Sequence, residues 1–166
     1  MVELEDLLAR DHAELERAVE VMASWRPTAD QRVALDAARL GFAAHAEAEA
    51  NVLHLGLVQV PTGHVASRLF TRALSAHSTQ EALLWRLARS VPNTVEWADA
   101  VDALRASFVE HHADEKLGLL PIVRELLSPE AYGQLATAYA TERLRALAMM
   151  SAVVARVRTS RRSARV

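Results

Sequence analysis

Hydrophobic residues recur every three or four positions along most of the chain, which is the spacing of residues on one face of an α-helix. In the first segment the apolar positions are Leu4, Leu7, Leu8, Leu15, Val19 and Met22. No segment shows the alternation of apolar and polar residues that is typical of a β-strand. The pattern therefore predicts an all-α fold.

Prolines, glycines and capping residues divide the chain into five predicted helices. Pro27, Pro61 and Pro92 follow the ends of the first three, and Ser128 followed by Pro129 is typical of a helix start. The predicted helices cover about residues 3–24, 28–58, 64–90, 93–121 and 129–158. We expect one domain over residues 1–158 and a short basic tail over residues 159–166.

Four of the seven histidines are followed, four residues later, by a glutamate, and each pair lies in a different predicted helix. The pairs are His12 with Glu16, His45 with Glu49, His77 with Glu81, and His111 with Glu115. An offset of four places two side chains on the same side of a helix, about one turn apart. Four such helices supply the ligand set with which a helix bundle holds two metal ions in its core.

The positions of the pairs along their helices permit a shared layer of ligands. Measured from the connecting turns, facing histidines differ in height by no more than about 8 Å in an up-and-down arrangement of helices, at 1.5 Å per residue. Imidazole and carboxylate donors suit iron, manganese and zinc. The sequence contains no cysteine, which excludes thiolate metal sites, disulfides and cysteine nucleophiles.

Composition and charge narrow the remaining possibilities. The chain has 166 residues, of which 51% are hydrophobic, and only five glycines and five prolines, which favours long helices. With a net charge of −2, the chain has no overall electrostatic field that would recruit nucleic acid or a membrane surface. The first ten residues are amphipathic and acidic, unlike a signal peptide, and no apolar stretch is long enough for a membrane span. We therefore expect a cytoplasmic protein.

The order of the histidines resembles that of the hemerythrin-like (HHE) cation-binding domain family. The resemblance covers about residues 3–145 and includes Asp11-His12, the two His-x-x-x-Glu motifs at 45–49 and 111–115, and His77 between them. Residues 108–121, FVEHHADEKLGLLP, are similar to the last motif of the family. The resemblance implies an antiparallel up-down four-helix bundle with an additional C-terminal helix. It also implies two iron ions (Fe²⁺/Fe³⁺), bridged by an oxo or hydroxo group.

The resemblance also implies which residues bind the metals. The implied ligands are His12, His45, Glu49, His77, His111 and Glu115, of which Glu49 and Glu115 are the bridging carboxylates. Oxygen-carrying hemerythrins have a second histidine one turn after the first on their third helix, and in this chain that position is Glu81. Glu81 is either a seventh ligand or a solvated carboxylate.

Several other polar residues are weaker candidates. Glu16 and His54 are expected to support the ligands without binding the metal. His112 follows a ligand directly and is expected to face the surface or another helix, because adjacent residues do not share a helix face. Tyr132 and Tyr139 are expected to fill packing positions.

The C-terminal segment has a distinct composition. Residues 146–155 are almost entirely apolar, and arginines follow. A helix that is apolar on all sides needs burial on more than one side, so this segment either packs on the bundle or forms a homodimer contact. Binding of the arginines to nucleic acid has no support from interleaved aromatic residues.

Two functional classes agree with these features. One is a non-haem di-iron oxidoreductase that activates dioxygen or hydrogen peroxide, either as an oxidase or oxygenase acting on a small organic substrate or as a peroxide-degrading enzyme. The other is a non-catalytic oxygen or iron carrier or sensor. A glutamate in place of a histidine makes the site more anionic and favours ferric iron over reversible oxygen release. The sequence therefore favours the enzyme.

Overall fold

The computed structural model describes residues 3–25, 27–58 and 64–163, although the side chains of residues 54, 55, 57, 58, 64 and 153–163 lie outside this description. Within these ranges the chain forms helices and no strand, so the predicted all-α fold is confirmed. The helices are α1 (Leu4–Ala23), α2 (Thr28–Val58), α3 (His64–Arg89), α4 (Val95–Asp114), the π-helical turn η1 (Glu115–Leu119), α5 (Leu120–Leu126) and α6 (Pro129–Ser163).

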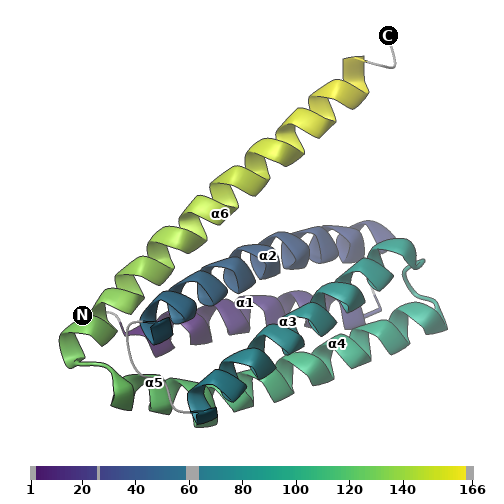
Figure 1. Cartoon of the computed structure of the whole chain (residues 1–166). Coiled ribbons are helices and arrows are strands. Elements are labelled where there is room, and N and C mark those ends of the chain that lie inside the picture. The colour runs from purple at the N-terminus through teal and green to yellow at the C-terminus, as the bar shows by residue number, and fades with distance from the viewer. Residues whose placement is uncertain (1–2, 26, 59–63, 164–166) are drawn as a thin grey trace.

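The first four helices pack along one another (Figure 1). α1 contacts α2 and α4, and α3 contacts the same two helices. The gap between α2 and α3 is therefore on the opposite side from the gap between α1 and α4. α6 packs against α2 and, to a smaller extent, α1, and its far end extends away from the other helices. No described helix is both long and apolar enough to cross a membrane.

Two of the helix boundaries differ from those expected. The predicted fourth helix does not end near Pro121, because η1 and α5 continue it to Leu126. A π-helical turn widens the backbone spiral by one residue per turn, and Pro121 then occupies the first turn of α5, where its missing N–H costs little. α6 continues to Ser163 instead of ending near Arg158.

The start of α4 also differs slightly from the predicted helix start near residue 93. Thr94, not Asn93, caps this helix, and its hydroxyl oxygen accepts a hydrogen bond of 3.3 Å from the Trp97 backbone N–H. Asn93 has a φ of 64°, in the left-handed region that asparagine tolerates better than most residues. This conformation turns the chain sharply between α3 and α4.

The interior consists of two apolar clusters. One contains the buried residues Leu4, Leu8, Ala48, Val52, Leu53, Ala66, Ala73, Leu119, Leu120, Val123, Tyr132, Leu135, Ala136 and Tyr139. The other contains Leu15, Val19, Met22, Ala34, Leu35, Ala38, Phe42, Leu84, Leu87, Trp97, Ala100, Val101, Leu104 and Phe108. Along each of α1, α2 and α3, and along α4 as continued by η1, the buried histidine falls between residues of the first cluster and residues of the second. The apolar core is therefore interrupted by a layer of polar side chains.

Candidate metal centre

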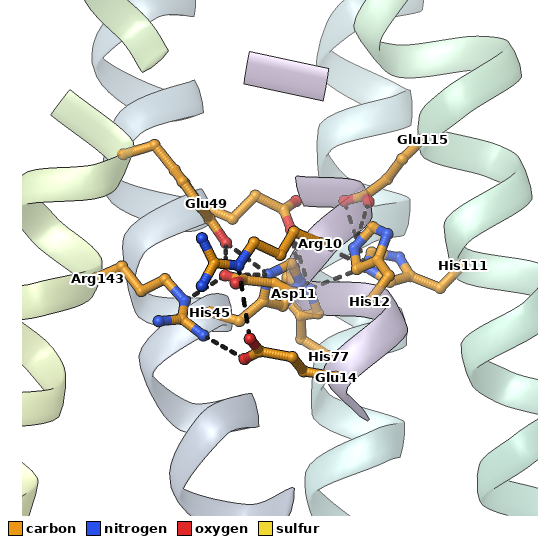
Figure 2. Close-up of polar contacts among 11 residues, drawn as sticks. Arg10, Asp11, His12, Glu14, His45, Glu49, His77, His111, Glu115 and Arg143 are labelled. Atoms are coloured by element: carbon orange, nitrogen blue, oxygen red, sulfur yellow. Dashed lines mark hydrogen bonds and ion pairs between the residues drawn. The ribbon is translucent and has the colours of Figure 1, made fainter. Parts of the chain in front are cut away.

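Six of the predicted metal ligands meet in this polar layer (Figure 2). Each of the first four helices contributes a histidine, α2 adds Glu49, and η1 adds Glu115. All six side chains are buried, with exposed fractions between 1% and 8%. The residues are His12, His45, Glu49, His77, His111 and Glu115.

The buried stripe of each helix explains which glutamates face this layer. On α2 both the third and the fourth residue after the histidine are buried, Ala48 and Glu49, and after His111 of α4 the next buried residue is Glu115 of η1. On α1 and α3 the third residue after the histidine is buried, which is Leu15 or Gln80. The glutamates four positions after His12 and His77 are exposed.

Glu81 and Glu16 therefore lie outside the cluster. Neither belongs to the groups of side chains that are close enough to share a metal ion. Gln80 takes the buried position on α3 in the turn after His77, and its amide donates a hydrogen bond of 3.2 Å to the Ser107 carbonyl. Glu81, for which a ligand and a solvated carboxylate were both open, is exposed. A role for Glu81 as a seventh ligand stays a prediction. The side chain of His54 is outside the described residues.

The six side chains form two overlapping groups, each compact enough to hold a metal ion. The first consists of His45, Glu49, His77 and His111, and the second of His12, His111 and Glu115. In the first, Glu49 Oε2 lies 3.3 Å from both His45 Nε2 and His77 Nε2. In the second, the Glu115 carboxylate lies 3.2 Å from His12 Nε2 and 3.3 Å from His111 Nε2.

These separations agree with donors that point at a common ion. His77 Nε2 and His111 Nε2 lie 3.0 Å apart. Two nitrogens bound at about 2.1 Å, at right angles on one ion, are separated by about 3 Å. Five side-chain atoms of the cluster are also buried without any hydrogen-bond partner: His12 Nε2, His45 Nε2, Glu49 Oε2, Glu115 Oε1 and Glu115 Oε2. Because buried polar atoms are normally paired, such unpaired donors are what a metal ion would satisfy.

Burial changes the protonation of these groups in the metal-free protein. It raises the pKa of Glu49 to about 7, and burial together with the nearby Glu49 charge raises the pKa of Glu115 to about 8. The two carboxyl groups lie close enough together for the charge of one to raise the pKa of the other. Burial lowers the pKa of His45 well below its ordinary value, and the neighbouring histidines lower it further. The imidazoles are therefore neutral and able to bind a metal ion.

These pKa values predict that metal binding depends on pH. At pH 7 Glu115 and part of Glu49 carry protons that must leave when the carboxylates bind a metal, whereas the histidines have none to lose. We expect the apparent affinity for Co²⁺ to rise between pH 6 and about pH 8 and to level off above that, with about one proton released per chain at pH 7. Calorimetric titration in two buffers of different ionisation enthalpy measures this release. Binding without proton release at pH 7 would contradict the assigned protonation states.

A hydrogen-bond network from α6 fixes the orientation of His45. The Tyr139 hydroxyl lies 2.8 Å from His45 Nδ1 and donates a hydrogen bond of 2.6 Å to the Asp11 carboxylate. Since the tyrosine proton is used by Asp11, its oxygen accepts from the His45 Nδ1–H, which leaves His45 Nε2 as the metal donor. Arg143 donates to Asp11 and also, at 3.1 Å, to Glu14. Such partners typically hold a ligating histidine in one tautomer and one orientation.

Removing this contact tests its role. Tyr139→Phe keeps the buried ring but leaves His45 Nδ1 without its acceptor, so we expect the affinity for Co²⁺ to fall about 10–100-fold. Competition with a chelator of known affinity measures this fall. Tyr132→Phe is a matched control, because the hydroxyl of this second α6 tyrosine contacts none of the six cluster residues. Equal affinities for the two variants would show that the network does not orient the ligand.

The sequence did not indicate four polar residues that surround the cluster. Tyr139, Asp11 and Gln80 are buried next to it, and His112 stacks on His12 with a ring-centre distance of 3.5 Å. Burial, assisted by the His77 charge, lowers the pKa of His112 to about 4, and its Nδ1 lies 2.9 Å from Glu16. The 3–4 residue spacing of buried positions on α3 could have identified Gln80. Nothing in the local sequence indicates the contacts of the other three.

Two cavities reach the cluster from opposite sides. The α2/α3 cavity has a volume of about 500 Å³, and His77 lies on its wall together with Phe42, Leu84 and Trp85. Glu81 and Arg39 line the same cavity, and the Arg39 guanidinium lies 4.3 Å from the centre of the Trp85 ring. The α1/α4 cavity has a volume of about 570 Å³, and its wall includes His12 and Glu115. Both sides of the cluster can therefore be reached by small molecules or ions.

Comparison of the chain with protein-family models, with curated proteins and with solved structures found no match in any of the three. What the cluster does must therefore be inferred from the side chains themselves.

Proposed function

We propose that this chain is a hemerythrin-like non-haem di-iron protein that activates dioxygen or peroxide. In this proposal α1 to α4 are an antiparallel up-down four-helix bundle and α6 is the additional C-terminal helix. The observation that carries the proposal is the pair of overlapping donor groups, which share His111 and together present four imidazoles and two carboxylates in a buried layer.

The donor set supports two ions of iron over a single ion of another metal. Nitrogen and oxygen donors without sulfur suit iron, manganese or zinc, and two carboxylates that lie close together are suited to bridging two cations. Six ligands are more than one tetrahedral zinc ion uses. When bound, the iron ions supply redox equivalents and act as Lewis acids.

The residues of this chain position the ions and control access to them. Glu49 and Glu115 would bind both metal ions, and Tyr139 keeps His45 Nε2 directed at the cluster. The two apolar clusters, one on each side of the polar layer along the helices, exclude bulk water. The α2/α3 cavity, which has mainly apolar and aromatic walls, is the place for a small organic substrate next to His77. Glu81 stands where oxygen-carrying hemerythrins have a second histidine, which leaves this side of the cluster with one imidazole fewer.

Reaction of the reduced, iron-loaded protein with oxygen tests the proposal. We expect mixing under single-turnover conditions to give ferric iron that is not reduced again when oxygen is removed, and we expect the ferric protein to consume added peroxide. Visible absorption follows the first reaction, and an oxygen electrode follows the second. An oxygen adduct that is stable for minutes and is released under vacuum, without peroxide consumption, would instead identify a carrier or sensor.

A further inference from the structure

The α1/α4 cavity differs from the α2/α3 cavity in charge. The carboxylates of Glu5, Asp6 and Glu16 lie on its wall, with Lys116 as the opposing cation. Of these, Glu5 is paired with Arg124 at 3.2 Å. The α2/α3 cavity has two carboxylates, Glu47 and Glu81, with Arg39 as the opposing cation, and Glu47 is paired with Arg145 at 2.6 Å. An approaching cation is therefore favoured on the α1/α4 side.

The inner end of this cavity is formed by two cluster residues whose polar atoms have no hydrogen-bond partners. Glu115 is 1% exposed, and neither of its carboxylate oxygens has a hydrogen-bond partner. His12 lies beside it, and its Nε2 is also unpaired. An ion that enters from this side thus reaches donors of the second group directly.

A further histidine–carboxylate pair lies on the same wall, outside the cluster. His112 Nδ1 lies 2.9 Å from the Glu16 carboxylate, which accepts the Nδ1–H. His112 Nε2 then carries a lone pair, and this atom is buried without a hydrogen-bond partner. A carboxylate that accepts from one ring nitrogen while the other remains free is the arrangement found behind metal-binding histidines. His112 also stacks face to face on His12, which places the pair next to the cluster.

We propose that the α1/α4 cavity is the route by which divalent cations enter the metal centre, with His112 and Glu16 as a transit site. A cation cannot cross an apolar wall without losing its hydration, so it needs replacement ligands along its path. Asp6 and Glu16 bind the cation at the exposed end of the cavity, and His112 binds it next. Glu115 and His12 then bind it at the cluster. This also gives a role to Glu16, which is spaced like a ligand but lies outside the cluster: it binds the cation at the entrance and not at the final site. The inference rests on the proposed function, because it needs a metal centre to load.

The rate of metal loading tests the route separately from the metal centre itself. The probe is Co²⁺, mixed in a stopped-flow instrument with metal-free protein and followed by its visible absorption. We expect Glu16→Gln and His112→Ala to slow loading about tenfold or more, and both variants to reach the parent's final Co²⁺ content. Ala9→Trp, which fills the same cavity from the exposed face of α1, is expected to slow loading in the same way. Ala43→Trp, which fills the α2/α3 cavity, is the matched control and is expected to load at the parent's rate.

The loading experiments distinguish a failure of the entry route from a failure of the metal centre. Unchanged loading in Glu16→Gln and Ala9→Trp, or slowed loading in Ala43→Trp, would overturn the entry route while leaving the metal centre intact. A lower final Co²⁺ content in both Glu16→Gln and His112→Ala would make these residues permanent ligands and would overturn their transit role. A parent protein that takes up no Co²⁺ at equilibrium would contradict the proposed function, and the entry route with it.

Discussion

Glu115→Leu is expected to lower the metal content from two ions to at most one per chain and, at the same time, to make the metal-free protein more stable. Glu115 is buried within reach of both His12 and His111, so its loss removes a donor from the second group and one of the two neighbouring carboxylates. In the metal-free protein the same carboxyl group is costly, because its oxygens are buried without hydrogen-bond partners. An unsatisfied buried polar group costs about 1–3 kcal/mol, so we expect the free energy of unfolding to rise by about this amount in the variant.

The comparison needs a control that changes charge without touching the cluster. Glu110→Leu serves this purpose, because Glu110 lies on α4 just before η1, with 72% of its side chain exposed, and its ion pair is with Arg72 on the surface. It is expected to keep full metal binding and nearly the parent's stability. Metal content by elemental analysis and urea unfolding of the metal-free proteins give the two readouts. A Glu115→Leu protein that binds two metal ions, or that is less stable than the metal-free parent, would contradict the role assigned to this carboxylate.

Adding metal to the metal-free parent is expected to raise its Tm strongly. A ligand that binds only the folded state stabilises it by about 4 kcal/mol when its free concentration is 1,000 times Kd. For a chain of this length, about 2–4 °C of Tm accompany each kcal/mol, so the expected shift is roughly 8–16 °C. The ligands come from four separate helices, which the unfolded chain does not hold together. Circular dichroism during heating, with and without Co²⁺, measures the shift.

The variants make this prediction specific to the cluster. Glu115→Leu is expected to show a smaller shift with Co²⁺ than the parent, because the second donor group is lost while the first remains. Tyr139→Phe is also expected to show a smaller shift at the same Co²⁺ concentration, because its affinity is lower. An equal shift in Glu115→Leu and in the parent would show that Glu115 is not a ligand.

The spacing of apolar residues was enough to predict the helices. The six residues that meet in the polar layer were predicted from the offsets of histidine and glutamate together with the resemblance to the hemerythrin-like family. Spacing of histidine and glutamate alone was not enough to decide which glutamates face inward. On α3 the buried positions are His77, Gln80, Leu84 and Leu87, and this series passes through the third residue after the histidine instead of the fourth. The chain therefore contained the information that distinguishes Glu81 from Glu49, in its apolar periodicity and not in its His/Glu pairs.

The surroundings of the cluster were not predictable from local patterns, because they depend on how distant segments pack. Tyr139 reaches His45 from a helix 94 residues further along the chain, and Arg143 reaches Asp11 across 132 residues. His112 was expected to face the surface or another helix, and it packs against α1, just before the π-helical turn at Glu115. That its partner there is the cluster residue His12 was not predictable from the sequence. Such turns occur often at functional sites, and no sequence signal here indicated one.

The most direct test of the di-iron proposal is to count and locate the metals in protein loaded with iron. Elemental analysis is expected to give two iron ions per chain, and X-ray absorption at the iron edge is expected to show nitrogen and oxygen neighbours with no sulfur, together with a second iron at about 3–4 Å. The four imidazoles and two carboxylates of the polar layer account for these neighbours. One iron or fewer per chain, or two irons without an iron–iron distance in this range, would contradict a di-iron centre.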